Sequence, residues 1–288
     1  MPPGKLTTAQ KLAINYYRAK INFINTLSTG WAAREALDIF TKPYPGRNKP
    51  DPVIWSSSQP LLLATDYGKV AGYCWKAEQP NGKKLLIVHG FGGNSRAFDR
   101  YIKPLLVKGY DVFAYDAPAH GKSDGKRLNA AAYVHVIETI IQKHGFFDGY
   151  IAHSLGGLSL MIALHQLKYE NNPKIVLIAP ATESTSAAEI FFGMLRLPSS
   201  IRSAFEKKVK DLVGVPLQWY SISRILHDVK GKILWLHDEE DHTTPIKDVY
   251  PLMNQQPLHV HFHFTKGLGH SRIYKDTKVK QLIIDFIS

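Results

Sequence analysis

A serine at the apex of a predicted sharp turn is the residue best suited to chemistry in this chain. Residues 152–156, Ala-His-Ser-Leu-Gly, separate a short apolar run at 149–151 from a longer one that begins at Leu158. Such a strand, turn and helix form a nucleophile elbow, which needs small residues two positions before and after the serine because the flanking backbones approach closely. Ala152 and Gly156 supply them, with alanine where glycine is more usual, so Ser154 is a candidate nucleophile.

A nucleophilic serine needs a base to take its proton and an acid to orient that base. The apolar run at 233–236 leads into residues 237–245, which contain four carboxylates. A second run at 259–264 leads into Gly-Leu-Gly-His-Ser at 267–271. Each segment follows the end of a predicted strand, so candidates for the acid and for the histidine both come after the serine in the sequence.

A glycine-rich segment supplies a candidate trap for negative charge. The buried-strand pattern at 85–88 runs into His-Gly-Phe-Gly-Gly-Asn at 89–94. Its glycines let the backbone turn amide groups toward an oxyanion that develops during reaction. The backbone amides of Phe91 and Leu155 are the candidates for this oxyanion hole.

These segments together make the chain resemble the α/β-hydrolase superfamily along nearly all its length. It is most similar to a bacterial group of largely uncharacterised serine hydrolases that carry an Asp-Ala-Pro-x-His-Gly-x-Ser segment, an Ala-His-Ser-Leu-Gly-Gly elbow and a Gly-x-Gly-His ending. In this chain they are residues 116–123, 152–157 and 267–270. The resemblance implies an α/β-hydrolase fold with Ser154 as nucleophile, Asp241 as acid and His270 as base, and it implies no substrate.

The choice of acid leaves an alternative open. Asp238, Glu239, Glu240 and Asp241 lie within one turn of chain. Asp241 is favoured because its spacing to Pro245 and from the strand end matches the family pattern. Asp238 is the main alternative.

Other polar residues near these segments are expected to be structural. Gly121 and Ser123 indicate a tight turn, so Asp116 is expected to bond loop amides and His120 to pack near the pocket. His153 is expected to point away from the nucleophile and to pack.

Composition narrows the class of protein. A chain of 288 residues that is 44% hydrophobic can bury a sizeable core. Its single cysteine, Cys74, cannot form an intramolecular disulfide and leaves no cysteine cluster for a metal. The formal charge of +12 comes from scattered lysines without a nucleic-acid motif, so no nucleic-acid partner is expected. A cytoplasmic location is expected because neither a signal peptide nor a membrane span is evident; oligomeric state is left open.

Histidine also alternates with apolar residues at 259–264, which places His259, His261 and His263 on one face of a strand. Neighbours on that face are nearly 7 Å apart, and three in a row rarely converge on one ion. A polar strand face is therefore favoured over a metal site, and no cofactor is expected.

The alternation of short apolar runs with helix-length segments predicts an α/β fold with a doubly wound, mostly parallel sheet. Antiparallel strands at 61–65 and 70–75 come first. The parallel strands that follow are residues 85–89, 111–116, 150–153, 175–179 and 233–237. The hydrolase domain is predicted to span 53–288, with a small helical cap at about 181–230 built from helices at 189–197, 201–213 and 217–226.

Residues 1–52 are predicted to form an N-terminal helical arm and a proline-rich connector, with helices at 8–29 and 31–40. The first helix has a narrow polar stripe and is otherwise apolar, so it must pack on something. Its own domain or the mouth of the active site is favoured. A peripheral contact with a membrane surface, or with a partner, is the alternative.

The resemblance and the residues predict hydrolysis of a carboxylic ester of a small or medium acyl substrate through an acyl-enzyme. A thioesterase or acyltransferase would use the same triad, and a non-catalytic binding protein of the same fold is the alternative from another class. Phe191, Phe192, Met194 and Trp219 are candidates for the acyl side of the pocket, or else they hold the cap together.

Overall fold

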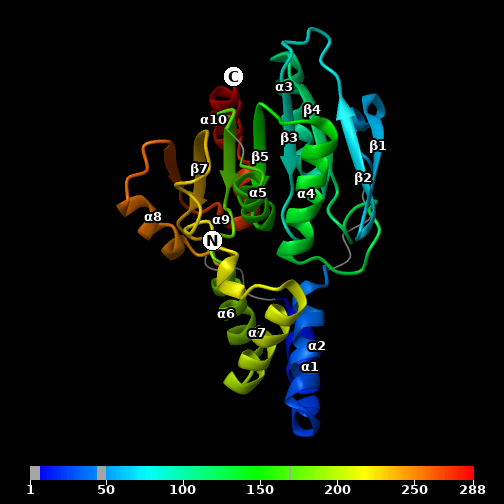
Figure 1. Ribbon diagram of the computed structural model, residues 1–288, viewed down its shortest axis with the longest axis vertical. Helices are drawn as coiled ribbons and strands as arrows, with labels where there is room; N and C mark the ends of the chain where they lie inside the picture. Colours follow the sequence, from blue (N-terminus) through cyan, green and yellow to red (C-terminus); the bar gives the residue numbers. More distant parts are fainter. Residues whose placement is uncertain (1–6, 44–49, 169) are drawn as a thin grey trace. The chain divides into compact units, whose positions relative to one another are not determined.

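The apolar runs of the sequence form a mixed sheet in the larger of two units into which the chain divides (Figure 1). The computed structural model describes residues 7–43, 50–168 and 170–288. The larger unit comprises described residues of 43–182 and 222–288, and the smaller comprises those up to Lys42 together with 183–221. The predicted connector falls largely on residues 44–49, which lie outside the described residues.

Within the described residues the sheet has eight strands in the order β1-β2-β4-β3-β5-β6-β7-β8. β2 pairs antiparallel with both β1 and β4, and every other neighbouring pair is parallel. The predicted doubly wound sheet with antiparallel N-terminal strands is therefore confirmed. The strands are β1 (Gln59–Thr65), β2 (Gly68–Trp75), β3 (Lys84–Val88), β4 (Asp111–Tyr115), β5 (Gly149–His153), β6 (Lys174–Ile178), β7 (Lys232–Asp238) and β8 (Val260–Thr265).

Helices cover both faces of this sheet, which explains why its central strands are apolar on both sides. Leu85 and Ile87 of β3 join the core beneath α3 (Asp99–Val107) and α10 (Thr277–Ile287). The alternate residues Leu86 and Val88 lie against α4 on the opposite face. The remaining helices of this unit are α4 (Ala130–His144), α5 (Leu155–Gln166), α8 (Tyr250–Asn254) and α9 (Gly269–Arg272), with short 3₁₀ helices at Val53–Ser57, Ser95–Phe98, Ile246–Asp248 and Ile273–Lys275.

The smaller unit is helical and joins two segments that are far apart in the sequence. It contains α1 (Thr8–Leu27), α2 (Thr29–Thr41), α6 (Ser184–Leu195) and α7 (Ser199–Val213). Thr7 and Gln10 form a capping box that starts α1, and Ser28 caps the start of α2. Ile21 of α1 and the alanines of α2 are buried with Phe205 and other apolar residues of α6 and α7. Among the described residues no helix is long and apolar enough to cross a membrane.

The predicted helix at 217–226 is wrong. A 3₁₀ helix occupies Leu217–Trp219, after which Ser221 forms an isolated antiparallel bridge with Glu183. The chain then continues in turns, in which Ile225 bonds back to Ile222. The apolar spacing that suggested a helix is present because these side chains are buried. Pairing of the backbone with the segment around Glu183 nevertheless prevents a continuous helix.

Candidate active site

Ser154 lies in a strained turn between β5 and α5. Its backbone has φ 53° and ψ −126°, a conformation that side-chain-bearing residues rarely adopt. The Ser154 N–H donates to the Ile178 carbonyl at 3.1 Å, and the Ser154 carbonyl accepts from the Ala181 N–H at 3.1 Å. The end of β6 therefore holds the turn in place, with the serine at its apex as expected of a nucleophile elbow.

Two glycines allow the backbones to pass close to this turn. A methyl group at Gly156 would lie 2.4 Å from the His89 carbonyl oxygen and 2.9 Å from that of Val88. A methyl group at Gly90 would lie 2.8 Å from the Ser154 Cβ. The first contact explains why the elbow needs a small residue after the serine. The second places the glycine-rich loop directly beside the candidate nucleophile.

Gly156→Ala is expected to lower the free energy of unfolding by about 2 kcal/mol or more, because backbone atoms cannot move aside as a flexible side chain can. Gly193→Ala is the matched control. It also lies in a helix, but a methyl group there would meet nothing within 4 Å, so the change should be neutral or stabilising by roughly 1 kcal/mol. Urea unfolding of both variants checks this, and equal stability of the two would contradict the close approach.

The structure brings Ser154, His270 and Asp241 together in one hydrogen-bonded chain. The Ser154 Oγ is 3.0 Å from the His270 Nε2, and the His270 Nδ1 is 2.8 Å from the Asp241 Oδ2. Since the carboxylate only accepts, the proton of a neutral ring lies on Nδ1. Nε2 is then free to accept from the serine hydroxyl, which is the tautomer that a general base requires.

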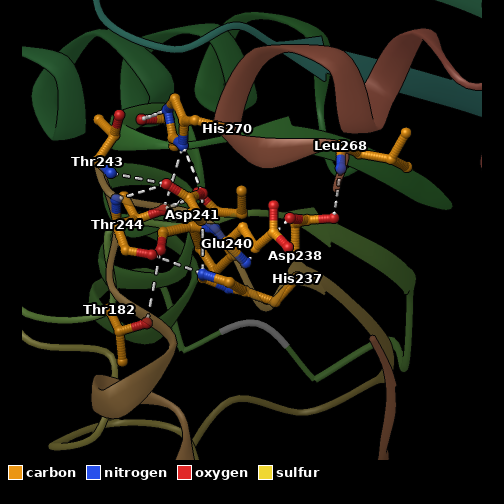
Figure 2. A network of polar contacts seen from close by, with 12 residues as sticks. Thr182, His237, Asp238, Glu240, Asp241, Thr243, Thr244, Leu268 and His270 are labelled. Carbon is orange, nitrogen blue, oxygen red and sulfur yellow. Dashed lines mark hydrogen bonds and ion pairs between the residues drawn. The ribbon is translucent and has the colours of Figure 1, made fainter. Parts of the chain in front are cut away.

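Asp241 is buried and held by its own loop. Its Oδ1 accepts from the N–H groups of Thr243 at 2.8 Å and Thr244 at 3.0 Å, and its Oδ2 accepts from the Thr244 hydroxyl at 2.8 Å (Figure 2). Burial acts to raise the pKa of Asp241, but the hydrogen bond and charge of His270 and the two loop amides outweigh it, so the pKa lies below its ordinary value. The group therefore faces His270 as a carboxylate.

Asp238, the alternative acid, braces the loop that carries His270. Its Oδ2 accepts from the Leu268 N–H at 2.9 Å (Figure 2). The same oxygen accepts from the Thr265 hydroxyl at 2.7 Å, and the Asp238 Oδ1 accepts from the Glu240 N–H at 3.0 Å. Burial raises the pKa of Asp238, and these donors lower it further than burial raises it. The two aspartates therefore differ in role: Asp241 contacts the imidazole of His270, and Asp238 positions the loop that carries His270.

The backbone amides of Phe91 and Leu155 are the predicted oxyanion hole. Leu155 is the first residue of α5, and the first N–H groups of a helix have no partner within it. Among the described residues, neither the Phe91 nor the Leu155 N–H has a hydrogen-bond acceptor. Phe91 follows Gly90 and Leu155 follows Ser154, the two residues that approach closely, so an oxyanion hole made by these two amides stays a prediction.

Two buried histidines hold the glycine-rich loop. The His120 Nε2 accepts from the Gly92 N–H at 2.9 Å, and its Nδ1 donates to the Pro118 carbonyl at 2.8 Å. The His89 Nε2 accepts from the Ala117 N–H at 2.8 Å, while its Nδ1 donates to the Gly90 carbonyl at 2.8 Å. Each ring must therefore be neutral to keep both bonds. The sequence predicts only packing for His120 and indicates no role for His89.

Asp116 connects the same loops, as expected. Its two carboxylate oxygens accept from the Ser95 N–H at 2.9 Å and the Lys122 N–H at 3.0 Å. Tyr133 adds a hydroxyl that donates to the His89 carbonyl at 2.9 Å. The candidate oxyanion loop is therefore fixed from several sides rather than free to collapse.

Acid is expected to destabilise the protein partly through His120. Burial lowers the pKa of His120 to about 4 from an ordinary value of 6.5, and the repulsion that two protonated rings would exert on each other, His120 and His89, adds to the effect. Between these values the unfolded chain binds the proton and the folded chain does not. The free energy of unfolding therefore falls as pH drops from about 6.5 to about 4, by on the order of 3 kcal/mol from this group.

His120→Gln supplies the comparison, since glutamine keeps an acceptor for the Gly92 N–H but does not titrate. Urea unfolding across this range should show a shallower pH dependence for the variant. Identical slopes for the two proteins would contradict a neutral His120 in the folded state.

His153 does more than the packing expected of it. Its Nε2 donates to the backbone carbonyl of His270 at 3.1 Å, and the two rings are 4.6 Å apart. Burial and the charge of His270 lower the pKa of His153 to about 3, which keeps the ring neutral. His153 therefore helps to position the candidate base, and its place directly before Ser154 was the only sequence signal of this role.

The predicted pocket residues all lie in the smaller unit. Phe191 and Phe192 are buried there, with edge-to-face ring contacts to Phe40 and Phe205 respectively. Met194 is exposed, and Trp219 contacts the Tyr220 ring edge-on. The two phenylalanines thus hold their own unit together, and a role of these four residues in a pocket stays a prediction.

The histidines of the last strand do not form a cluster. His261 and His263 are exposed on β8, whereas His259 precedes the strand and donates to the Leu226 carbonyl at 3.1 Å. Across the part of the chain that the structure describes, no group of three histidine, cysteine or acidic side chains is arranged to hold a metal ion.

The fold and site define a class: an open, doubly wound sheet with a serine, imidazole and carboxylate in contact at the ends of its parallel strands. The sequence model described as the alpha/beta hydrolase family matches residues 85–274. The chain therefore belongs to the alpha/beta hydrolase family.

Known proteins extend this finding. A Mycoplasma pneumoniae protein whose name proposes an esterase or lipase, number 3 of its kind, is 28% identical over 155 residues, covering 52% of this chain and 53% of that protein. A second Mycoplasma pneumoniae protein, numbered 2 in the same series of names, is 26% identical over 115 residues. These residues cover 38% of this chain and 42% of that protein. The chain thus spans about half the length of these relatives. Among solved structures, the esterase Pf2001 of Pyrococcus furiosus has a TM-score of 0.62 at 20% identity, covering 85% of this chain and 95% of that one.

Proposed function

We propose that this protein hydrolyses carboxylic esters of small or medium acyl groups through an acyl-enzyme on Ser154. The continuous contact from Asp241 through His270 to the Ser154 hydroxyl carries the proposal, because it supplies an oriented base for an otherwise unreactive alcohol. The relatives named for esterase or lipase activity support ester substrates.

The proposed reaction has two steps. His270 takes the Ser154 proton as Oγ attacks the ester carbonyl, and the Phe91 and Leu155 amides stabilise the oxyanion. The imidazolium then returns the proton to the alcohol that leaves. In the second step His270 takes a proton from water, which attacks the acyl-serine. The imidazolium then returns that proton to the Ser154 Oγ as the bond to the acyl group breaks and the carboxylic acid leaves. Asp241 remains a carboxylate throughout and stabilises the imidazolium.

The same groups would transfer an acyl chain from a thioester or to another acceptor. A thioesterase domain from a curacin pathway shares this fold, with a TM-score of 0.56 at 15% identity. The fold does not separate ester from thioester substrates, because the triad determines the acyl-transfer chemistry and the pocket determines which acyl group binds.

A substrate panel tests the proposal. p-Nitrophenyl esters of graded acyl length should be hydrolysed with a preference for short or medium chains, and matched acyl thioesters should react more slowly. Faster turnover of the thioesters would show that the substrates are thioesters and not carboxylic esters. Absence of turnover on every substrate by correctly folded protein would overturn the enzymatic proposal in favour of a binding protein.

A further inference from the structure

The first helix of the smaller unit leaves an apolar stripe uncovered. Leu12, Tyr16, Phe23 and Leu27 of α1 are 62–67% exposed. At 100° per residue these four side chains fall within about 60° of one another on the helix surface. Ile21 on the opposite side is fully buried. The helix therefore uses one apolar face for its own unit and presents a second to its surroundings.

The turn that follows extends this stripe. α1 ends at Leu27 and α2 begins at Thr29, so the two helices form a hairpin. Trp31, in the first turn of α2, is 66% exposed. Phe23, Leu27 and Trp31 thus place two aromatic rings and an aliphatic side chain near the tip of the hairpin. Large exposed apolar patches of this kind mark an interaction surface.

The charge of α1 selects the kind of partner. Lys11, Arg18 and Lys20 are its only charged residues, and all three are basic. Helix geometry puts Lys20 at one edge of the stripe and Lys11 beyond the other. Arg18 donates to the backbone carbonyls of Met194 and Leu195, which carry no charge and therefore do not compensate its positive charge. Lys20, by contrast, pairs with the carboxylate of Glu35 at 2.7 Å. An exposed apolar stripe on a helix whose charged residues are all basic is typical of helices that lie in a membrane interface.

We propose that the α1–α2 hairpin docks on anionic lipid surfaces, with the stripe of Leu12, Tyr16, Phe23, Leu27 and Trp31 inserted at the headgroup boundary. A second copy of this chain fits the surface less well, because it carries the same net positive charge. An anionic bilayer compensates these charges, and the net charge of +12 adds to the attraction. The proposal does not depend on the hydrolytic activity.

Vesicle flotation of the full chain tests it. The protein should float with vesicles that contain phosphatidylglycerol, and binding to phosphatidylcholine alone should be weaker by roughly tenfold or more. High salt should weaken binding to the anionic vesicles without abolishing the apolar contribution. Equal binding to both vesicle types, or no flotation with either, would overturn the proposal.

A pair of double variants isolates the stripe. Phe23→Ser with Leu27→Ser should lower flotation by roughly tenfold or more. Leu212→Ser with Leu258→Ser removes two other leucines that are 62% and 98% exposed, and should leave flotation unchanged. Circular dichroism melts should be alike for all three proteins, since only exposed side chains are changed. Flotation of the stripe variant at the wild-type level would overturn the proposal, as would a wild-type dimer that the same variant dissociates without any vesicle binding.

Discussion

Replacement of Ser154 by alanine is expected to lower kcat on ester substrates by about 10⁴- to 10⁶-fold. The hydroxyl is the atom on which the proposed acyl-enzyme forms, and its oxygen is the His270 partner at 3.0 Å. Alanine fits the space, so the unfolding midpoint should change little. Steady-state kinetics on the preferred p-nitrophenyl ester, with active-site concentration held equal, measures the loss.

Ser159→Ala is the matched control for this prediction. Ser159 lies on α5, five residues beyond the nucleophile, and its buried hydroxyl has no hydrogen-bond partner among the described residues. Removal of an unsatisfied buried hydroxyl is nearly neutral or stabilising, so activity should stay at the wild-type level. Retention of ester hydrolysis by Ser154→Ala would show that another group attacks the substrate.

Asp241→Asn is expected to lower kcat by about 10⁴-fold with little change in KM. The asparagine amide no longer stabilises an imidazolium, and it favours the tautomer in which Nδ1 accepts rather than donates. The Ser154 hydroxyl then faces a protonated Nε2 that cannot act as base. Because Thr243 and Thr244 can still bond the amide oxygen, the variant should remain folded, as a circular dichroism melt would show.

Asp238→Asn distinguishes the two aspartates. This substitution removes the carboxylate that accepts hydrogen bonds from Thr265, Leu268 and Glu240, and it leaves the contact between Asp241 and the imidazole in place. The free energy of unfolding should therefore fall, while kcat should change little. The accepted bonds are charge-assisted, and their weakening should cost about 1–3 kcal/mol. The assignment of Asp241 would be wrong if Asp238→Asn abolished turnover while Asp241→Asn retained it.

The strands of the sheet were predictable because each is an apolar run flanked by turn residues. Predicted residues 150–153 compare with the observed β5 (Gly149–His153), and 175–179 with β6 (Lys174–Ile178). The helix at 217–226 failed because its apolar spacing reflects burial in consecutive turns. The shared core of α1, α2, α6 and α7 was not predicted, since nothing in the local pattern states which distant segment covers a helix face.

In the candidate site, too, some residues were predictable from the sequence and others were not. Ser154 and His270 lie 116 residues apart, and only glycine-flanked loops at strand ends and the family order linked them in advance. Side chains that position others left weaker signals. The His153 bond to the His270 carbonyl and the His120 bond to the Gly92 N–H depend on loop paths that spacing cannot define. Asp238 and Asp241 were distinguished by family spacing, whereas the hydrogen bonds supply the physical reason.

An activated serine at position 154 is the claim on which the proposed function rests, and a fluorophosphonate tests it most directly. Intact-mass and peptide analysis should find one phosphonyl group per chain, on Ser154. Labelling should be absent in Ser154→Ala and slowed by about a hundredfold or more in His270→Ala, where the base is lost. A folded wild-type protein that stays unlabelled, or that carries the adduct on another residue, would contradict the account.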